Sequence, residues 1–116
     1  KSSINKKLKK GKIKINQKID FHGCSIEEAK ELFLSTINEC FLKNYRCILF
    51  ITGKGINKKL SDKSLEKKLY FGKIRNNFLR WTSIQAAQNK ILNVQQANIE
   101  NGGDGAFFVY LRKNKN

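Results

Sequence analysis

The chain has 116 residues, of which 40% are hydrophobic, so its size suits one domain with a modest core. Its formal net charge is +15, from 24 basic and 9 acidic residues. No apolar run approaches the roughly 20 residues of a membrane-spanning helix, and the basic start leads into no secretory signal. The charge favours a polyanion, which means nucleic acid or an anionic membrane surface. Of these we expect nucleic acid as the partner and no membrane. A codon-biased genome is the alternative source of this lysine excess.

Residues 1–11 are rich in lysine and lack periodicity, which predicts a disordered basic arm. From residue 12 the pattern changes. Isoleucines alternate with polar residues, apart from a polar slip at Gln17, and this alternation predicts a half-buried strand that ends in the sequence IDFHGC. We expect the ordered domain to span residues 12–112 and the tail, residues 113–116, to be frayed.

A helix is predicted to begin after Ser25, which forms a capping box with Glu28. Asn44 is suited to stop this helix. The next segment, RCILFIT at 46–52, is continuously apolar, as expected of a central strand covered on both faces. Strand, helix and strand then form a βαβ unit with parallel strands. The apolar face of the helix is expected to consist of Ile26, Ala29, Phe33, Ile37, Cys40 and Phe41.

The second half of the chain begins with a lysine-rich stretch, 56–71, which predicts a long mobile loop. A second helix is expected over 73–85, with Ile74, Phe78 and Trp81 on its inner side. Two more strands follow, near 91–97 and at 106–112. The fold class is therefore α/β (α+β), in the element order βαβαββ.

The cysteines are three in number and show no CxxC spacing. An odd, sparse set argues against a disulfide framework and a cysteine-based zinc site, and it suits a reducing, cytoplasmic setting. Cys24 stands two residues from His22, a spacing that rarely gives the geometry of a thiol nucleophile.

Polar residues follow both strands of the βαβ unit. The first strand ends in Asp20, Phe21, His22 and Gly23, and the second ends in TGKG at 52–55. Because parallel strands end at the same edge, His22 and Lys54 are expected to lie close together. The N-terminus of the first helix would favour an anion there, and glycines let backbone amides approach it. The GKG sequence therefore predicts a phosphate cradle.

His22 is the single histidine of the chain, and Asp20 precedes it by two residues. A carboxylate beside an imidazole fixes its tautomer and raises its basicity, which suits a general base for phosphodiester attack. The alternative is a structural histidine in a turn. A metal site of Asp20 and His22 would need another ligand, for which Asp104 is the candidate.

Several further residues allow both a functional and a structural interpretation. Lys73, Arg75 and Arg80 would contact phosphates or face solvent, and Arg75 is favoured because it lies near the start of the second helix. Asp104 lies in GGDG, which is either part of the site or a plain turn between strands. Trp81 would stack on a base, although its position in the inner stripe favours core packing. No Walker loop or dinucleotide-binding fingerprint occurs, so no nucleotide cofactor is expected.

Four motifs together carry a family resemblance: IDFHGCSIEEAK, RCILFITGKG, GKIRNNFLRW and ENGGDGAFFVYLR. In this order they resemble the Smr (small MutS-related) domain family over residues 12–112. The resemblance implies a two-layer sandwich with a four-stranded mixed sheet, like the C-terminal domain of translation initiation factor 3. It also implies nucleic-acid binding and, in several members, DNA nicking or RNA cleavage.

Carried over residue by residue, the resemblance implies an active site around Asp20, His22 and Lys54. Thr52 stands where many members have a second histidine. The substrate-binding positions are expected to be Gly23, Thr52, Gly53, Gly55, Lys73, Arg75, Gly103, Asp104 and Gly105.

Three hypotheses remain at this point. The first is a small basic endonuclease linked to DNA repair, recombination or RNA quality control. The second is a non-catalytic module that binds nucleic acid or the ribosome. The third is the C-terminal piece of a mismatch-repair or recombination-control protein that supplies a contact surface. The choice between DNA and RNA, the use of a divalent metal and the oligomeric state stay open.

Overall fold

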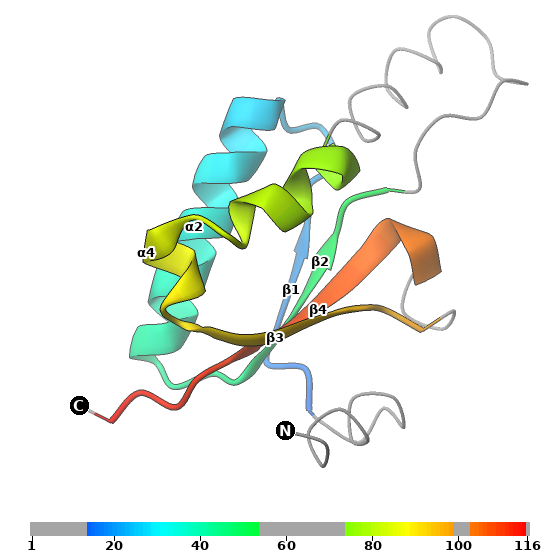
Figure 1. Ribbon diagram of the computed structural model, residues 1–116. Helices are drawn as coiled ribbons and strands as arrows, with labels where there is room; N and C mark the ends of the chain where they lie inside the picture. Colours follow the sequence, from blue (N-terminus) through cyan, green and yellow to red (C-terminus); the bar gives the residue numbers. More distant parts are fainter. Residues whose placement is uncertain (1–13, 54–73, 99–102, 116) are drawn as a thin grey trace, which may run out of the picture.

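The structure, a computed structural model, describes residues 14–53, 74–98 and 103–115 (Figure 1). The predicted basic arm at 1–11 and the predicted loop at 56–71 lie outside these residues. The described parts form one mixed sheet with helices on one of its sides (Figure 1).

The sheet has four strands in the order β1-β2-β4-β3. Strands β1 (Gln17–Asp20) and β2 (Cys47–Ile51) are parallel. Strand β4 (Ala106–Leu111) is antiparallel to β2 and to β3 (Ile91–Gln96). The parallel βαβ unit and the four-stranded mixed sheet are thus confirmed, and β4 proves to lie between β2 and β3.

Helix α2 (Ile26–Leu42) begins where the sequence predicts. The Ser25 amide donates to Glu28 Oε1 at 2.8 Å, and the Glu28 amide donates to Ser25 Oγ at 3.1 Å. This reciprocal pair satisfies two of the amides that a helix start leaves without partners. At the other end, Asn44 adopts a left-handed φ of 59°, which terminates the helix as predicted.

The second helix is shorter than predicted. Residues 74–81 are helical, a turn follows, and α4 (Gln85–Gln88) is a separate short helix. The Thr82 hydroxyl donates to the carbonyl oxygen of Leu79 at 2.6 Å. The backbone amide of Ser83 donates to the carbonyl oxygen of Arg80, three residues back, at 3.1 Å. The Thr82 hydroxyl thus competes with helical bonding, and the Ser83 amide forms the tighter bond to the third residue back, so the expected continuation to residue 85 was wrong.

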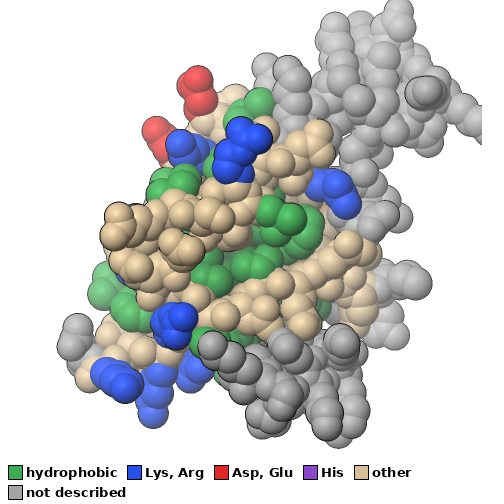
Figure 2. All heavy atoms as spheres, in the orientation of Figure 1, with side chains coloured by type: hydrophobic (Ala, Val, Ile, Leu, Met, Phe, Trp, Pro, Cys, Tyr) green, Lys and Arg blue, Asp and Glu red, His purple; other side chains and the backbone are tan. Residues whose placement is uncertain are grey.

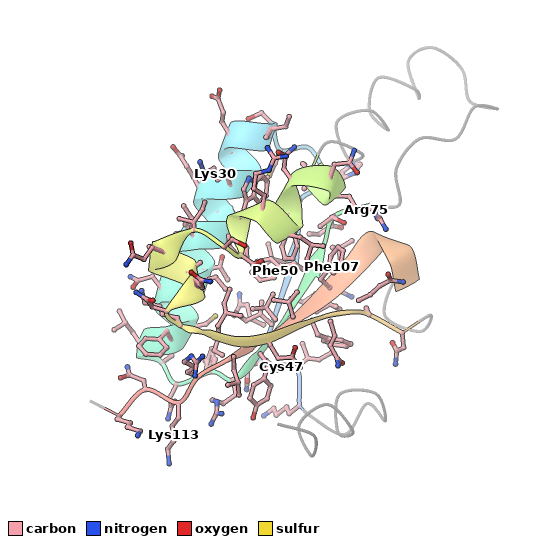
Figure 3. All side chains as sticks on the ribbon, in the orientation of Figure 1. Lys30, Cys47, Phe50, Arg75, Phe107 and Lys113 are labelled. Carbon is pink, nitrogen blue, oxygen red and sulfur yellow. The ribbon has the colours of Figure 1, made fainter. Side chains whose placement is uncertain are left out.

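The main core lies between the helices and the sheet. Trp81 is 4% exposed and packs edge-on against Phe21, so its predicted core position is confirmed. Phe50 and Phe107 point into this layer from the sheet (Figure 3). A smaller apolar cluster on the other face of the sheet includes Cys47 and Leu49, so β2 is buried on both faces as expected. The aromatic residues of the main core are Phe21, Phe33, Phe50, Phe78, Trp81 and Phe107.

Candidate active site

Three turns meet where β1 and β2 end and β4 begins. The Phe21 amide donates to the carbonyl oxygen of Ile51 at 3.1 Å, which joins the first turn to β2. The amides of Thr52 and Gly53 donate to the Gly105 carbonyl oxygen at 2.7 and 3.0 Å. Thr52 and Gly53, the first residues of TGKG, therefore lie beside the DFHG turn and are hydrogen-bonded to the GDG turn.

The DFHG turn alternates between core and solvent. Phe21 is fully buried and stacks on Phe50 at 5.6 Å between ring centroids, whereas Asp20 and His22 are exposed on either side of it. Gly23 has a φ of 83°, which favours glycine. The turn is closed by a hydrogen bond from the Cys24 amide to the carbonyl oxygen of Phe21 at 3.0 Å. The buried ring thus holds the exposed imidazole at the edge of the sheet.

The Asp20 carboxylate contacts the main chain of this turn. Its Oδ1 accepts the backbone N–H of His22 at 2.9 Å. This is an Asx-type bond, in which a side chain replaces a backbone acceptor and fixes the turn. Asp20 thereby fixes the backbone from which the imidazole projects, and orientation of the ring itself by the carboxylate stays a prediction.

Thr52 links two of the turns. It is fully buried, and its hydroxyl lies 3.1 Å from the Gly53 carbonyl oxygen and 3.3 Å from that of Gly105. Gly53 has a φ of 84° and is partly exposed. The threonine side chain therefore contacts the protein itself, while the glycine presents backbone at the edge.

The GDG turn, η2 (Gly103–Gly105), is fixed by its own hydrogen bonds. The Gly103 amide donates to the Asn98 carbonyl oxygen at 2.8 Å, and its φ is 52°. A Cβ at Gly23 or Gly103 would meet no heavy atom within 4 Å. Both glycines therefore face open space that a ligand could enter. The side chain of Asp104 is outside what the structure describes.

The N-terminus of α2 is less available to an anion than expected. The capping box uses the amides of Ser25 and Glu28, and Glu27 and Glu28 bring negative charge to the first turn. Carboxylates there interact with the helix dipole in place of a phosphate. An anion at this edge would therefore be stabilised chiefly by other residues.

The Cys24 thiol is not suited to act as a nucleophile. Burial raises its pKa, and the nearby carboxylates of Glu28 and Asp20 raise it further. A raised pKa keeps the sulfur protonated at neutral pH, whereas the nucleophile is the thiolate.

Arg75 is one of the cations that the described structure places toward this edge. It is half-buried in the first described turn of helix 74–81, and it lies at the end of the molecule where β1 and β2 end (Figure 3). The predicted residues Lys54, Gly55 and Lys73 lie outside the described residues. Within the described ranges, no three His, Cys, Asp or Glu side chains are grouped to hold a metal ion.

The sequence reading missed the roles of Phe21 and of the Gly105 carbonyl. The role of Phe21 could have been predicted from the alternation of side chains along a strand, because a residue between two exposed polar ones at a strand end points into the core. The second had no signal in the sequence, since it depends on β4 pairing with β2.

The fold and this edge define a small two-layer α+β domain with its polar motifs at one end of the sheet. The profile of the Smr domain family matches residues 19–112, so the chain belongs to the Smr domain family. Members of this family generally bind nucleic acid, and some have nuclease activity. None of the described helices is both long and apolar enough to cross a membrane.

Two solved structures share the fold. The stand-alone small MutS-related protein YdaL from Escherichia coli has a TM-score of 0.73 and 24% identity, over 97% of this chain and 77% of that one. The Smr domain of Thermus thermophilus MutS2 has a TM-score of 0.60 and 18% identity, over 83% of this chain and 98% of that one. A comparison with curated proteins found no match.

Proposed function

We propose that this Smr domain is an endonuclease that cleaves phosphodiester bonds of DNA or RNA at the edge formed by the three turns. The observation that carries the proposal is the exposed His22, whose backbone is fixed by Asp20 in a turn where Gly23 faces open space, as Gly103 does in the GDG turn. A general base needs this combination of a fixed position and access to the substrate.

In the proposed reaction His22 removes a proton from water or a ribose 2′-hydroxyl. The resulting oxygen attacks phosphorus, the bond to the leaving oxygen breaks, and that oxygen takes up a proton from solvent. Lys54, the amides of the GKG sequence and Arg75 stabilise the negative charge that builds up on the phosphoryl oxygens. Gly23 and Gly103, where an added Cβ would meet open space, let the nucleic-acid backbone approach the turns closely, and the buried Gly105 supports them through its carbonyl oxygen. We assign Asp104, Gly55 and Lys73 to substrate contacts around this centre.

The test is a cleavage assay on supercoiled plasmid and on a structured RNA, with and without EDTA. His22→Ala and Lys54→Ala are compared with the wild type and with Lys18→Ala, a matched control because Lys18 is an exposed lysine of β1. Cleavage that His22→Ala abolishes while binding persists supports the enzyme. The preferred polymer then assigns the domain to DNA repair and recombination or to RNA quality control, and the EDTA lanes decide whether a divalent metal takes part.

Thr52 favours a second candidate, a non-catalytic module that binds nucleic acid or the ribosome. In many family members a histidine occupies this position, whereas the Thr52 hydroxyl is buried against backbone carbonyls and cannot replace a proton-transferring imidazole. Binding without cleavage by the wild type, or cleavage unchanged in His22→Ala, would establish this module instead of the enzyme.

A further inference from the structure

The end of the sheet opposite the candidate active site joins four chain segments. Asn16 Oδ1 accepts the amides of Arg46 and Cys47 at 2.8 and 3.1 Å, which joins the segment before β1 to the one before β2. The Arg112 amide donates to the carbonyl oxygen of Lys90 at 2.8 Å, and the Asn114 side chain donates to that of Phe41 at 3.1 Å. The connections before and after the strands therefore form one cross-linked surface.

This surface carries a group of cations from three of these segments, which we call the basic end. Its cations gather along the lower left border of the molecule in Figure 2, whereas the Asp and Glu side chains of that view lie at the opposite end, among further Lys and Arg side chains. Lys113 marks this end in Figure 3, far from Arg75. The basic end consists of Lys43, Arg46, Lys90, Arg112, Lys113 and Lys115.

Aromatic rings hold three of these cations in place. Lys43 Nζ lies 5.7 Å from the ring centroid of Tyr45, and Lys90 Nζ lies 5.9 Å from that of Phe41. The Arg46 guanidinium lies 4.9 Å from the Tyr110 ring centroid, and its Nε donates to the Leu111 carbonyl oxygen at 2.8 Å. Cations fixed in this way lose less conformational entropy when they bind an anion than solvated lysines do.

The described carboxylates are distributed in the opposite way. Asp20 and the acids of the first half of α2 lie toward the candidate active site. Among the described carboxylates, Glu39 in the second half of α2 is the one that lies toward the basic end. The basic end thus combines a strong positive field with fixed geometry. A row of phosphates is the anion that several spaced, fixed cations match, since each cation neutralises one phosphate.

We propose that the basic end is a second nucleic-acid contact surface, which binds backbone phosphates away from the point of cleavage. The inference rests on the proposed function, because it takes the partner to be nucleic acid. The contacts are to the backbone and carry no sequence information. They raise affinity without taking part in the chemistry.

The test compares two triple variants in a His22→Ala background, which prevents cleavage during the titration. One is Lys43→Gln/Arg112→Gln/Lys113→Gln at the basic end. The matched control is Lys18→Gln/Lys30→Gln/Arg80→Gln. All six side chains are exposed, and each variant loses three positive charges. Binding of a fluorescent 20-nucleotide single strand and of a 20-base-pair duplex is measured across a salt series, and circular dichroism checks folding.

We expect the basic-end variant to lower the slope of log affinity against log salt by about 2 to 3, since each phosphate contact contributes about 0.7 to 0.9. Its affinity at low salt should fall about tenfold or more, and the control should change the slope by less than about one. The single variant Lys113→Gln, at an exposed residue beyond β4, provides a graded check, with an expected loss of roughly 0.7 to 0.9 in slope.

Each other outcome overturns a distinct statement. Equal losses in both triple variants mean that net charge alone acts, and they overturn the second surface while leaving the proposed function intact. A wild-type affinity that does not change with salt overturns the proposed function as well. Vesicles of phosphatidylserine and phosphatidylcholine form the last arm. If the basic-end variant loses vesicle binding but binds nucleic acid like the control, the surface binds membrane and the inference fails.

Discussion

The two ends of the sheet are built differently. At the candidate active site, backbone hydrogen bonds and glycines at positive φ hold short turns from which Asp20 and His22 project into solvent. At the basic end, long cationic side chains lie on aromatic rings. The first arrangement fixes one chemical group in an open space, and the second spreads charge over a surface. The two proposals together assign the reaction to one end of the sheet and much of the affinity to the other.

The separation is incomplete in one respect. The described residues at the candidate active site include the carboxylates of Asp20, Glu27 and Glu28, so this edge needs cations to attract a phosphate. The sequence of 54–73 carries seven lysines and directly follows Gly53. We expect Lys54 in particular to supply that charge, and the Lys54→Ala variant measures its share.

The largest expected effect is the loss of cleavage in His22→Ala. Removing a general base typically lowers the rate by about 10²–10⁴-fold. Because the imidazole is exposed and lies outside the core, stability and nucleic-acid affinity should change little. Rate constants at saturating substrate, measured beside those of the basic-end variant, test the separation. The basic-end variant should keep the wild-type rate at saturation, and a parallel fall in both variants would contradict two distinct surfaces.

Gly23→Ala should have the next largest effect. Gly23 has a φ of 83°, and an added Cβ would meet no atom within 4 Å, so the cost is backbone strain of about 1–2 kcal/mol. Relaxation of the strain would move His22 and slow cleavage. The control comes from the other end, where Asn44 has a φ of 59°. Asn44→Ala should lower the free energy of unfolding, measured with urea, without slowing cleavage at saturating substrate.

Ser25→Ala should cost about 0.5–2 kcal/mol, because the capping hydroxyl that accepts the Glu28 amide is lost. Thermal or urea unfolding measures this, with Ser35→Ala as a mid-helix control on the same helix.

Hydrogen bonds from the Ser25 backbone amide and side chain lower the pKa of Glu28. The carboxylate therefore stabilises the fold above pH 4.5, and its contribution disappears as the pH falls through the lowered pKa. A Glu28→Gln variant that keeps the full acid sensitivity would contradict this assignment.

What could be read from the sequence was local or periodic. The capping box of Ser25 and Glu28 and the stop at Asn44 depend on neighbours along the chain, so both were predicted correctly. The end of the second helix was missed because Thr82 and Ser83 form bonds that helical periodicity does not reveal.

The features that escaped the sequence depend on strand order. Gly105 accepts from Thr52 and Gly53 because β4 pairs with β2. Likewise, Lys43, Lys90 and Arg112 are far apart in the chain and become one surface through the positions of β2, β3 and β4. The basic end therefore had no counterpart in the sequence motifs, whereas the D-x-H edge did.

The smallest expected effect comes from the titration of the Cys47 thiol at alkaline pH. Cys47 lies in the apolar cluster on the face of the sheet away from the helices. Burial raises the pKa of its thiol from 9.0 to about 11. The folded state therefore holds this proton to higher pH than the unfolded state does, and stability should fall as the pH rises from about 9 to about 11. Urea unfolding under reducing conditions should show a shallower decline over this range for Cys47→Ala than for the wild type. Cys24→Ala is the control, since its thiol is less buried. An equally steep decline in Cys47→Ala would mean that other groups carry the alkaline sensitivity.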